Sequence, residues 1–422
     1  MKTEKFFQLN PCCHVVSGAK RGAIYNTESG RTYSIDGSSL RILRFLHEGL
    51  SFEQVVKKVA LPPEIISGFM YQLKAIGLGD FFSRKKFMTR KILEPVRPPL
   101  SFLWLELTKS CNLHCLHCYA SAGGCCDATD LMTVNDWERV LREARSIGCA
   151  SVSITGGEPT LKPFLKRVIK LAFDLGYRIN LDTNATLIDK SLEKVIIDCG
   201  VMVHVSIYSN NPKVHDQITQ VRGSFEKTMS SIRALKKVGV PVSFEVVVMK
   251  ENQKGLGATL DFIRSLGEIR PTRCFDFLRP VGRGRKGNPV SCGFLEDLQY
   301  LQRPTFLPVY EKEFVKRISG NDCWQGKLCV LPSGNVVPCV LAREDVCGNV
   351  LKTSLGEIVN GNELKKFWSL SKDKISVCQD CEYRYACPDC RPKAKAGGGE
   401  NLYAKPYQCF YDPYSGIWGK GR

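Results

Sequence analysis

Three cysteines stand close together in the first half of the chain, Cys111, Cys115 and Cys118, in the order C-x3-C-x2-C. Three thiolates on one loop can wrap one face of a cubane iron–sulfur cluster, and they leave the fourth iron without a protein ligand. An iron with an open position can bind a substrate or a cofactor. A zinc site would need a fourth ligand, for which His114 or His117 is available. The triplet taken alone therefore favours a cluster over zinc.

A second group of eight cysteines lies near the C-terminus: Cys323, Cys329, Cys339, Cys378, Cys381, Cys387, Cys390 and Cys409. Eight ligands exceed one zinc site and suit two four-ligand sites, so two zinc ions remain an alternative to two clusters. A disulfide framework belongs to small secreted domains. The polar, charged start of this chain is not a secretory signal. We therefore expect metal or cluster ligation for most of these cysteines.

The residues around the first triplet narrow its chemistry. Tyr119 follows the third cysteine, and an expected strand ends in Thr155-Gly156-Gly157-Glu158-Pro159. Two glycines let the backbone approach a ligand closely. This combination resembles the radical S-adenosylmethionine (SAM) superfamily, whose motifs are C-x3-C-x-aromatic-C and G-G-E-P. His117 occupies the position before the last cysteine, where another ring is common. The resemblance covers residues 101 to about 285.

The resemblance implies a specific reaction. The open iron chelates the amino and carboxylate groups of SAM, an electron from the reduced cluster cleaves a carbon–sulfur bond, and the 5′-deoxyadenosyl radical takes a hydrogen atom from the substrate. By the same resemblance the residues that contact SAM are Tyr119, Gly156, Gly157, Glu158, Thr183, Asn184, Ser206 and Tyr208. For the last four, ordinary loop polarity is the alternative interpretation. Asn252 is a weaker candidate for the same role.

The C-terminal cysteines resemble the SPASM domain, the auxiliary-cluster domain of radical SAM enzymes that modify peptides and proteins. The ligand order of that family is interleaved. It implies an inner cluster on Cys323, Cys329, Cys339 and Cys390, and an outer cluster on Cys378, Cys381, Cys387 and Cys409. Two residues, where the family usually has three, separate Cys387 from Cys390, and Cys347 is an alternative inner ligand. The implied cofactors are SAM and three [4Fe–4S] clusters, and fully ligated auxiliary clusters imply electron transfer out of the substrate.

Six strands alternate with amphipathic helical stretches between residues 101 and 280. The expected strands are Phe102 to Leu107, Ser151 to Ile154, Arg178 to Asp182, Met202 to Ile207, Ser243 to Met249 and Cys274 to Leu278. Regular β-α alternation indicates a parallel sheet, and the predicted fold class is α/β with a partial (β/α)6 barrel. Chemistry in such folds sits at the carboxyl ends of the strands. Glu106, Asp182 and Asp276 lie there and are candidates for a general base, although structural roles are equally consistent.

The first 82 residues have a different pattern. Short strands are expected at His14 to Val16, Arg21 to Tyr25 and Arg31 to Ile35, followed by helices at Leu40 to Leu46, Ser51 to Ala60 and Pro63 to Ile76. This winged-helix-like order resembles the peptide-recognition element of maturases of ribosomally made peptides, which binds a leader peptide as an added strand. A DNA-binding winged helix is the alternative. Its reading helix should cluster Arg, Lys, Asn or Gln, whereas the third helix offers only Gln72 and Lys74.

Composition agrees with a globular, multi-domain protein. We predict a leader-recognition domain over residues 1–85, a barrel over 100–290 and an auxiliary-cluster domain over 315–422, with a basic, proline-containing linker at 83–99. The formal net charge is +18, but the basic residues are spread along the chain and cluster thiolates would lower it. No apolar run reaches the roughly 18 residues of a membrane span. We expect a cytoplasmic protein without nucleic-acid or membrane partners.

The leading hypothesis is a radical SAM oxidoreductase that acts on a ribosomally made precursor peptide and forms a thioether, carbon–carbon or carbon–oxygen crosslink. Its partners would be a precursor peptide with a leader and an external one-electron donor such as flavodoxin or ferredoxin. The alternatives are a protein maturase that forms formylglycine, as anaerobic sulfatase-activating enzymes do, a cofactor- or porphyrin-modifying enzyme, and a zinc-dependent nucleic-acid-binding protein. Of the remaining cysteines, Cys149, Cys199 and Cys274 suit small buried hydrophobic positions, and Cys125 and Cys126 could have a functional role.

Overall fold

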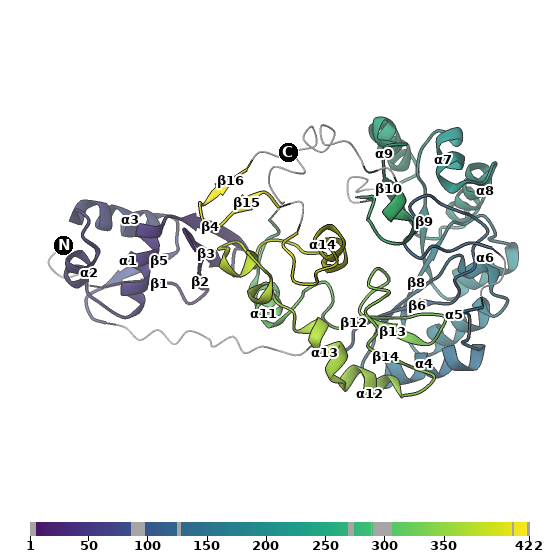
Figure 1. Cartoon of the computed structure of the whole chain (residues 1–422), viewed down its shortest axis with the longest axis horizontal. Helices are drawn as coiled ribbons and strands as arrows, with labels where there is room; N and C mark the ends of the chain where they lie inside the picture. Colours follow the sequence, from purple (N-terminus) through teal and green to yellow (C-terminus); the bar gives the residue numbers. More distant parts are fainter. Residues whose placement is uncertain are drawn as a thin grey trace.

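The computed structural model describes residues 6–85, 98–124, 128–268, 274–287, 289, 306–406 and 409–419. Figure 1 shows the N-terminal helices and strands at one end, the six-stranded barrel at the other, and the C-terminal segment between them. Within these residues, no helix combines the length and the hydropathy that a bilayer crossing requires. The expected linker at 83–99, Cys125, Cys126 and Cys292 lie largely or wholly outside the described residues.

The N-terminal part is a three-stranded antiparallel sheet followed by three helices. The strands are β2 (Cys13–Ser17), β3 (Gly22–Asn26) and β4 (Arg31–Ile35), in the order β2-β3-β4. The helices are α1 (Gly37–His47), α2 (Phe52–Val59) and α3 (Pro63–Ala75). Asp36 caps α1 by accepting a hydrogen bond from the Ser39 amide at 2.7 Å, and Ser51 caps α2 in a capping box with Gln54. This order of elements is the one that the sequence predicts.

Two further strands close this part of the molecule. They are β1 (Phe6–Leu9) and β5 (Gly79–Phe82), which pair antiparallel and bring the two ends of the segment together. Phe7 of β1 is 2% exposed and packs its ring against Phe81 of β5 at 5.1 Å. Sequence analysis missed both strands because four residues are too few to show a period.

The barrel contains the six predicted strands, and all neighbours pair in parallel. They are β6 (Phe102–Glu106), β7 (Ser151–Thr155), β8 (Arg178–Thr183), β9 (Met202–Ser206), β10 (Val242–Val248) and β11 (Phe275–Phe277). The connecting helices are α4 (Val134–Ser146), α5 (Leu165–Asp174), α6 (Lys190–Asp198), α7 (Pro212–Thr219), α8 (Ser224–Lys237) and α9 (Leu256–Ser265). The expected α/β fold with a partial barrel is therefore confirmed.

Alternation along the strands explains why the barrel has a packed outside and a polar inside. Leu105, Val152 and Ile154 are fully buried members of the main hydrophobic core, which they share with the surrounding helices. Each such side chain contributes about 1.5–3 kcal/mol by leaving water. The register places Asp182 of β8 opposite His204 of β9, and both side chains line the interior cavity. The carboxyl ends of the strands therefore face a space that polar groups share.

The C-terminal segment extends the barrel sheet. Strand β12 (Lys327–Val330) runs parallel beside β6, and β13 (Asn335–Val337) and β14 (Gly348–Asn349) follow antiparallel, so that nine strands form one sheet. The other elements are α11 (Glu311–Ser319), α12 (Leu355–Asn360), α13 (Asn362–Trp368), α14 (Arg391–Gly397), β15 (Tyr411–Asp412) and β16 (Ile417–Trp418). The register sets Cys329 beside Trp104, so an expected cluster ligand stands next to a residue that lines the barrel cavity.

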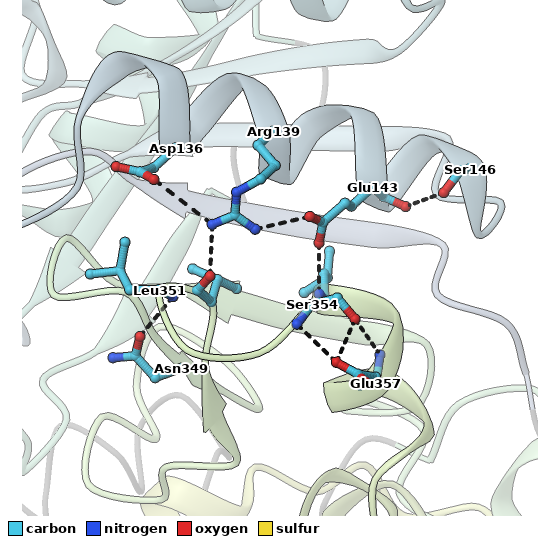
Figure 2. Close-up of polar contacts among 10 residues, drawn as sticks. Asp136, Arg139, Glu143, Ser146, Asn349, Leu351, Ser354 and Glu357 are labelled. Atoms are coloured by element: carbon cyan, nitrogen blue, oxygen red, sulfur yellow. Dashed lines mark hydrogen bonds and ion pairs between the residues drawn. The ribbon is translucent and has the colours of Figure 1, made fainter.

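Helix α4 fastens the C-terminal segment to the barrel, as Figure 2 shows. Arg139 donates to the carbonyl of Val350 at 2.7 Å, and Glu143 accepts the amide of Leu355 at 2.7 Å. Arg139 also donates to Glu143 at 2.9 Å, so the two side chains hold each other in place. Because the Leu355 amide is one of the unpaired donors at the start of α12, the carboxylate of Glu143 also favours that helix end.

Candidate active site

The strands open at their carboxyl ends into a cavity of about 650 Å³. Ten of the eleven residues expected at the SAM site line it: Cys111, Cys115, Cys118, Tyr119, Gly156, Gly157, Thr183, Asn184, Ser206 and Tyr208. The eleventh, Glu158, is fully buried behind the wall. A concave site with a few convergent polar groups is the usual form of a cofactor and substrate pocket.

The cysteine loop leaves β6 and returns along the barrel rim. The amide of Leu113 donates to the Cys111 sulfur and the amide of Ala122 donates to the Cys118 sulfur, each at 3.4 Å. Burial, with smaller contributions from the charges of Glu158 and Cys118, raises the pKa of Cys111 to about 11. Burial also raises the pKa of Cys115, with Cys118 and Cys111 adding to the shift. Metal binding deprotonates such thiols, so these buried, mutually repelling sulfurs fit a shared cluster.

Arg283 supports this loop from the far end of the barrel, a role that sequence analysis missed. Its guanidinium donates to the carbonyls of Cys115 at 2.9 Å and Ala122 at 2.7 Å, and the Arg283 amide donates to the Cys118 carbonyl at 3.0 Å. Its charge lowers the pKa of Cys111 and of Cys115, against the larger effect of burial. Arg283 lies about 165 residues from the motif in sequence, and nothing local connects them.

The two glycines of the second motif are needed for packing. A Cβ atom on Gly157 would lie 2.2 Å from the carbonyl oxygen of Ser110, and one on Gly156 would lie 2.7 Å from that of Thr108. Both oxygens belong to the segment that leads into Cys111. The structure thus shows close approach of the cysteine loop, and the close approach of a ligand to these glycines stays a prediction.

Glu158 fixes the end of the third barrel strand. It is fully buried and accepts hydrogen bonds from the Thr183 hydroxyl at 2.6 Å and the Asn184 amide at 2.8 Å, as well as from Thr160. Burial raises the pKa of Glu158, and its hydrogen bonds lower it. Glu158 therefore positions Thr183 and Asn184, which themselves line the cavity, and the expected direct contact of Glu158 with SAM stays a prediction.

Two rings form one wall of the cavity. His117 and Tyr208 meet edge to face with 4.5 Å between ring centroids. Burial lowers the pKa of His117 to about 4, so its ring is neutral. His117 thus fills the aromatic position of the motif as a packing ring. Asn252 is different: it is 5% exposed and bonds the Tyr208 carbonyl at 2.8 Å and the Met249 amide at 2.8 Å, so it braces this wall.

The three candidate general bases have different surroundings. Glu106 is fully buried in a bidentate ion pair with Arg343. Asp276 is paired with Arg279, and Lys393 lies 3.8 Å away. Asp182 instead accepts a hydrogen bond from Ser153 at 2.7 Å and faces His204 of the next strand at 3.6 Å. Burial raises the pKa of Asp182 to about 6, close to the pH at which a proton acceptor works well.

Charge interactions between the C-terminal thiols fall into two groups. Electrostatic coupling links Cys323 with Cys339 and Cys390, and Cys329 with Cys339. A separate coupling links Cys378 with Cys387 and Cys409, and Cys381 with Cys378 and Cys409. These charge interactions agree with the interleaved inner and outer sets, which stay predictions.

The remaining cysteines stand apart from these sets. The charges that raise the pKa of Cys347 are Asp345 and Glu363, and no cysteine is among them. Cys149 and Cys199 are buried hydrophobic-core positions, as expected. Whether Cys347 replaces an inner ligand stays the open alternative that the sequence offers.

Across the described residues, no three His, Cys, Asp or Glu side chains are close enough to hold a single ion. Two other groups complete the surroundings: the Trp324 indole donates to the Cys339 sulfur at 3.3 Å, and the buried Lys372 ammonium donates to the Cys387 carbonyl at 2.7 Å.

Comparison with known proteins now places the chain. Residues 105–263 match the radical SAM superfamily, and residues 323–382 match the SPASM iron–sulfur cluster-binding domain. The chain therefore contains a radical SAM domain followed by a SPASM domain. These matches confirm the expected cofactors, SAM and [4Fe–4S] clusters with auxiliary clusters included. They leave the zinc-protein alternative without support.

Individual relatives divide between two substrate classes. The AdoMet-dependent heme synthase of Methanosarcina barkeri is 29% identical over 349 residues, which are 75% of this chain and 97% of the relative. The PqqA peptide cyclase of Gluconobacter oxydans is 26% identical over 340 residues, 75% of this chain and 92% of the relative. Sequence similarity therefore establishes the enzyme class and leaves the substrate open.

Solved structures share the fold. Streptococcus suis SuiB bound to the precursor peptide SuiA has a TM-score of 0.53 at 17% identity, over 95% of this chain and 99% of that chain. The protein anSMEcpe with bound AdoMet and Cp18Cys peptide has a TM-score of 0.55 at 18% identity, over 75% of this chain and 94% of that chain. At these identities the likeness shows the fold alone. SuiB matches nearly the whole chain, N-terminal part included.

Proposed function

We propose that this enzyme oxidises, and in doing so crosslinks, a ribosomally made precursor peptide whose leader binds the N-terminal domain. The observation that carries the proposal is an open sheet edge. Among the described strands, β4 pairs with β3 on one side and with none on the other. Helix α3 of the same domain exposes Ile65 and Tyr71, at 57% and 44%, and Ile76 directly after the helix is 53% exposed. An extended peptide can add to such an edge and place apolar side chains on such a surface.

The chain's own residues divide the work at the barrel. We assign Cys111, Cys115 and Cys118 to the SAM-binding cluster and the two C-terminal sets to the auxiliary clusters. When bound, these groups supply a hydrogen-abstracting radical from SAM and an acceptor for the electron that the substrate gives up. Arg283 and Glu158 hold the loops around the cavity, and the His117–Tyr208 wall shields it from water. Asp182 is the group that we assign to accept the proton released when a crosslink forms. An external donor of the flavodoxin or ferredoxin type would supply the reducing electron.

Mass spectrometry on co-expressed peptide tests this proposal. The enzyme would be produced anaerobically with each short open reading frame that lies beside its gene. We expect one peptide to become lighter by the mass of two hydrogen atoms per event, and to remain unchanged with the Cys111→Ala enzyme. As a matched control, Cys149→Ala alters a buried cysteine of the same barrel that belongs to no cluster set, and it should leave the modification intact.

A tetrapyrrole substrate is the second candidate, because this chain aligns with nearly the whole length of the heme synthase relatives. It would leave the N-terminal sheet edge without a role. Incubating the reduced enzyme with SAM and iron coproporphyrin III, the tetrapyrrole named in another relative, tests it directly. Conversion of that porphyrin with no change in any peptide would replace the peptide proposal. A formylglycine product, the third candidate, would appear as a change of mass on a single Cys or Ser.

A further inference from the structure

The N-terminal sheet hydrogen-bonds the loop that carries the proposed outer ligands Cys381 and Cys387. Tyr25 of β3 is fully buried, and its hydroxyl donates to the carbonyl of Glu382 at 2.8 Å. The amide of Ala19 donates to the carbonyl of Asp380 at 2.8 Å. Arg384 of the loop also contacts the sheet: its guanidinium donates to the carbonyl of Ser17 at 2.9 Å and, within the loop, to the carbonyl of Cys381 at 2.9 Å. The backbone is therefore held on both sides of Cys381.

Packing joins the same two segments. A small hydrophobic core contains Val16, Ala23 and Tyr25 from the sheet, Val309 and Phe314, and Tyr385 and Ala386 from the loop. The Tyr25 ring lies 5.3 Å from that of Phe314 and 6.2 Å from that of Tyr385. A Cβ atom on Gly18 would lie 2.9 Å from the Glu382 amide nitrogen, so the turn between β2 and β3 sits directly on the loop. Figure 1 shows this sheet against the C-terminal segment.

The loop needs such support because it has little structure of its own. Its one regular element is a short 3-10 turn at Cys378–Asp380. The residue before it, Val377, has φ 67° and ψ −42°, a conformation that a β-branched side chain adopts only when its surroundings impose it. Backbone groups in such a loop must find partners elsewhere, and the N-terminal sheet with its β2–β3 turn supplies two of them, for the carbonyls of Asp380 and Glu382.

We propose that the N-terminal sheet is a structural part of the outer auxiliary centre, and that Tyr25 and Gly18 are positioning residues for the loop of Cys381 and Cys387. The inference rests on the proposed outer ligand set and is independent of the peptide substrate. It gives the N-terminal domain a second role, because the strand next to the open β4 edge also holds a cluster loop. A peptide bound at the β4 edge would be separated by one strand from β3, whose Tyr25 contacts the outer-cluster loop.

Three variants and a reference test the proposal in the full-length holoenzyme. Gly18→Val forces a side chain against the Glu382 backbone, and Gly68→Val is the matched control, because a Cβ atom there meets nothing within 4 Å. Tyr25→Phe removes a single hydroxyl. Cys378→Ala identifies the spectroscopic signal of the outer cluster by difference.

Iron and sulfide content and electron paramagnetic resonance of the reduced protein are the measurements. We expect Gly18→Val to lose about four of about twelve irons together with the outer-cluster signal, and Gly68→Val to lose none. Tyr25→Phe should keep its iron and shift the midpoint potential of the outer cluster alone. Full iron content with an unchanged outer signal in Gly18→Val, or unchanged midpoints in Tyr25→Phe, would overturn the inference. Equal iron loss in Gly68→Val would also overturn it, because domain folding would then explain the effect. If no peptide is modified, the proposed function fails, but the iron content and the spectroscopic signals still test the inference about the outer-cluster loop.

Discussion

Removing Arg343 should weaken the junction between the barrel and the SPASM domain. Glu106 of β6 is fully buried, the Arg343 side chain is 19% exposed, and the pair is bidentate with one N–H···O distance of 2.8 Å. The neighbouring charges of Glu106 and Tyr119 raise the pKa of Arg343, against the lowering effect of burial. Arg343→Met leaves a buried carboxylate without its partner, which costs about 3–5 kcal/mol. The double variant Glu106→Leu/Arg343→Met should recover most of that loss, since apolar replacements of a buried pair are often neutral.

Anaerobic thermal unfolding of the holoenzyme, followed by circular dichroism, measures this effect. For an unfolding unit of 150–250 residues, the single variant should lower the Tm by roughly 6–20 °C. The control is Arg264→Met, which breaks an exposed pair with Asp261 on α9 and should cost less than about 1 kcal/mol. A Tm of Arg343→Met equal to that of Arg264→Met, or a double variant as unstable as the single one, would refute the reasoning.

Three further predictions concern the barrel. The pKa of Asp182 is about 6 in the folded state against a usual 3.8, so proton binding favours the folded state. The free energy of unfolding therefore falls as the pH rises from 4 through 6, and Asp182→Asn should make the Tm less dependent on pH over that range. Gly157→Ala should lose the SAM-binding cluster, measured as about a third of the iron, since its Cβ would strike Ser110, whereas Gly257→Ala meets open space and should lose none. Glu158→Gln should raise the Kd for SAM in equilibrium dialysis by about tenfold, and an unchanged Kd would contradict its positioning role.

The sequence predicts the barrel well because its information is local. Strands β8 and β9 alternate buried residues with less buried ones, and amphipathic helices such as α4, with its capping residue Thr133, connect the barrel strands. The pairing of β12 with β6 had no such signal. Residues 327–330 meet residues 102–105 across more than two hundred positions, and only the folded chain shows that the SPASM segment continues the barrel sheet.

The candidate site was predictable where its residues form a motif. The spacing of Cys111, Cys115 and Cys118 identifies the loop, and a family resemblance orders the later cysteines. The residues that hold the site in place could not be predicted in this way. Arg283 and Arg343 come from distant segments of the chain, and no local motif distinguishes them from the other arginines. The packing constraint at Gly157 could not be predicted from the sequence either, since it depends on where Ser110 lies in the folded chain.

The substrate class is the central claim, and one competition experiment tests it most directly. Reduced enzyme would be incubated with SAM and an equimolar mixture of the candidate precursor peptide and iron coproporphyrin III, and both would be weighed after the reaction. The account predicts a peptide lighter by two hydrogen atoms per event, an unchanged porphyrin, and loss of the peptide product when the β4 edge is blocked by Thr32→Pro. A modified porphyrin beside an unchanged peptide would contradict it.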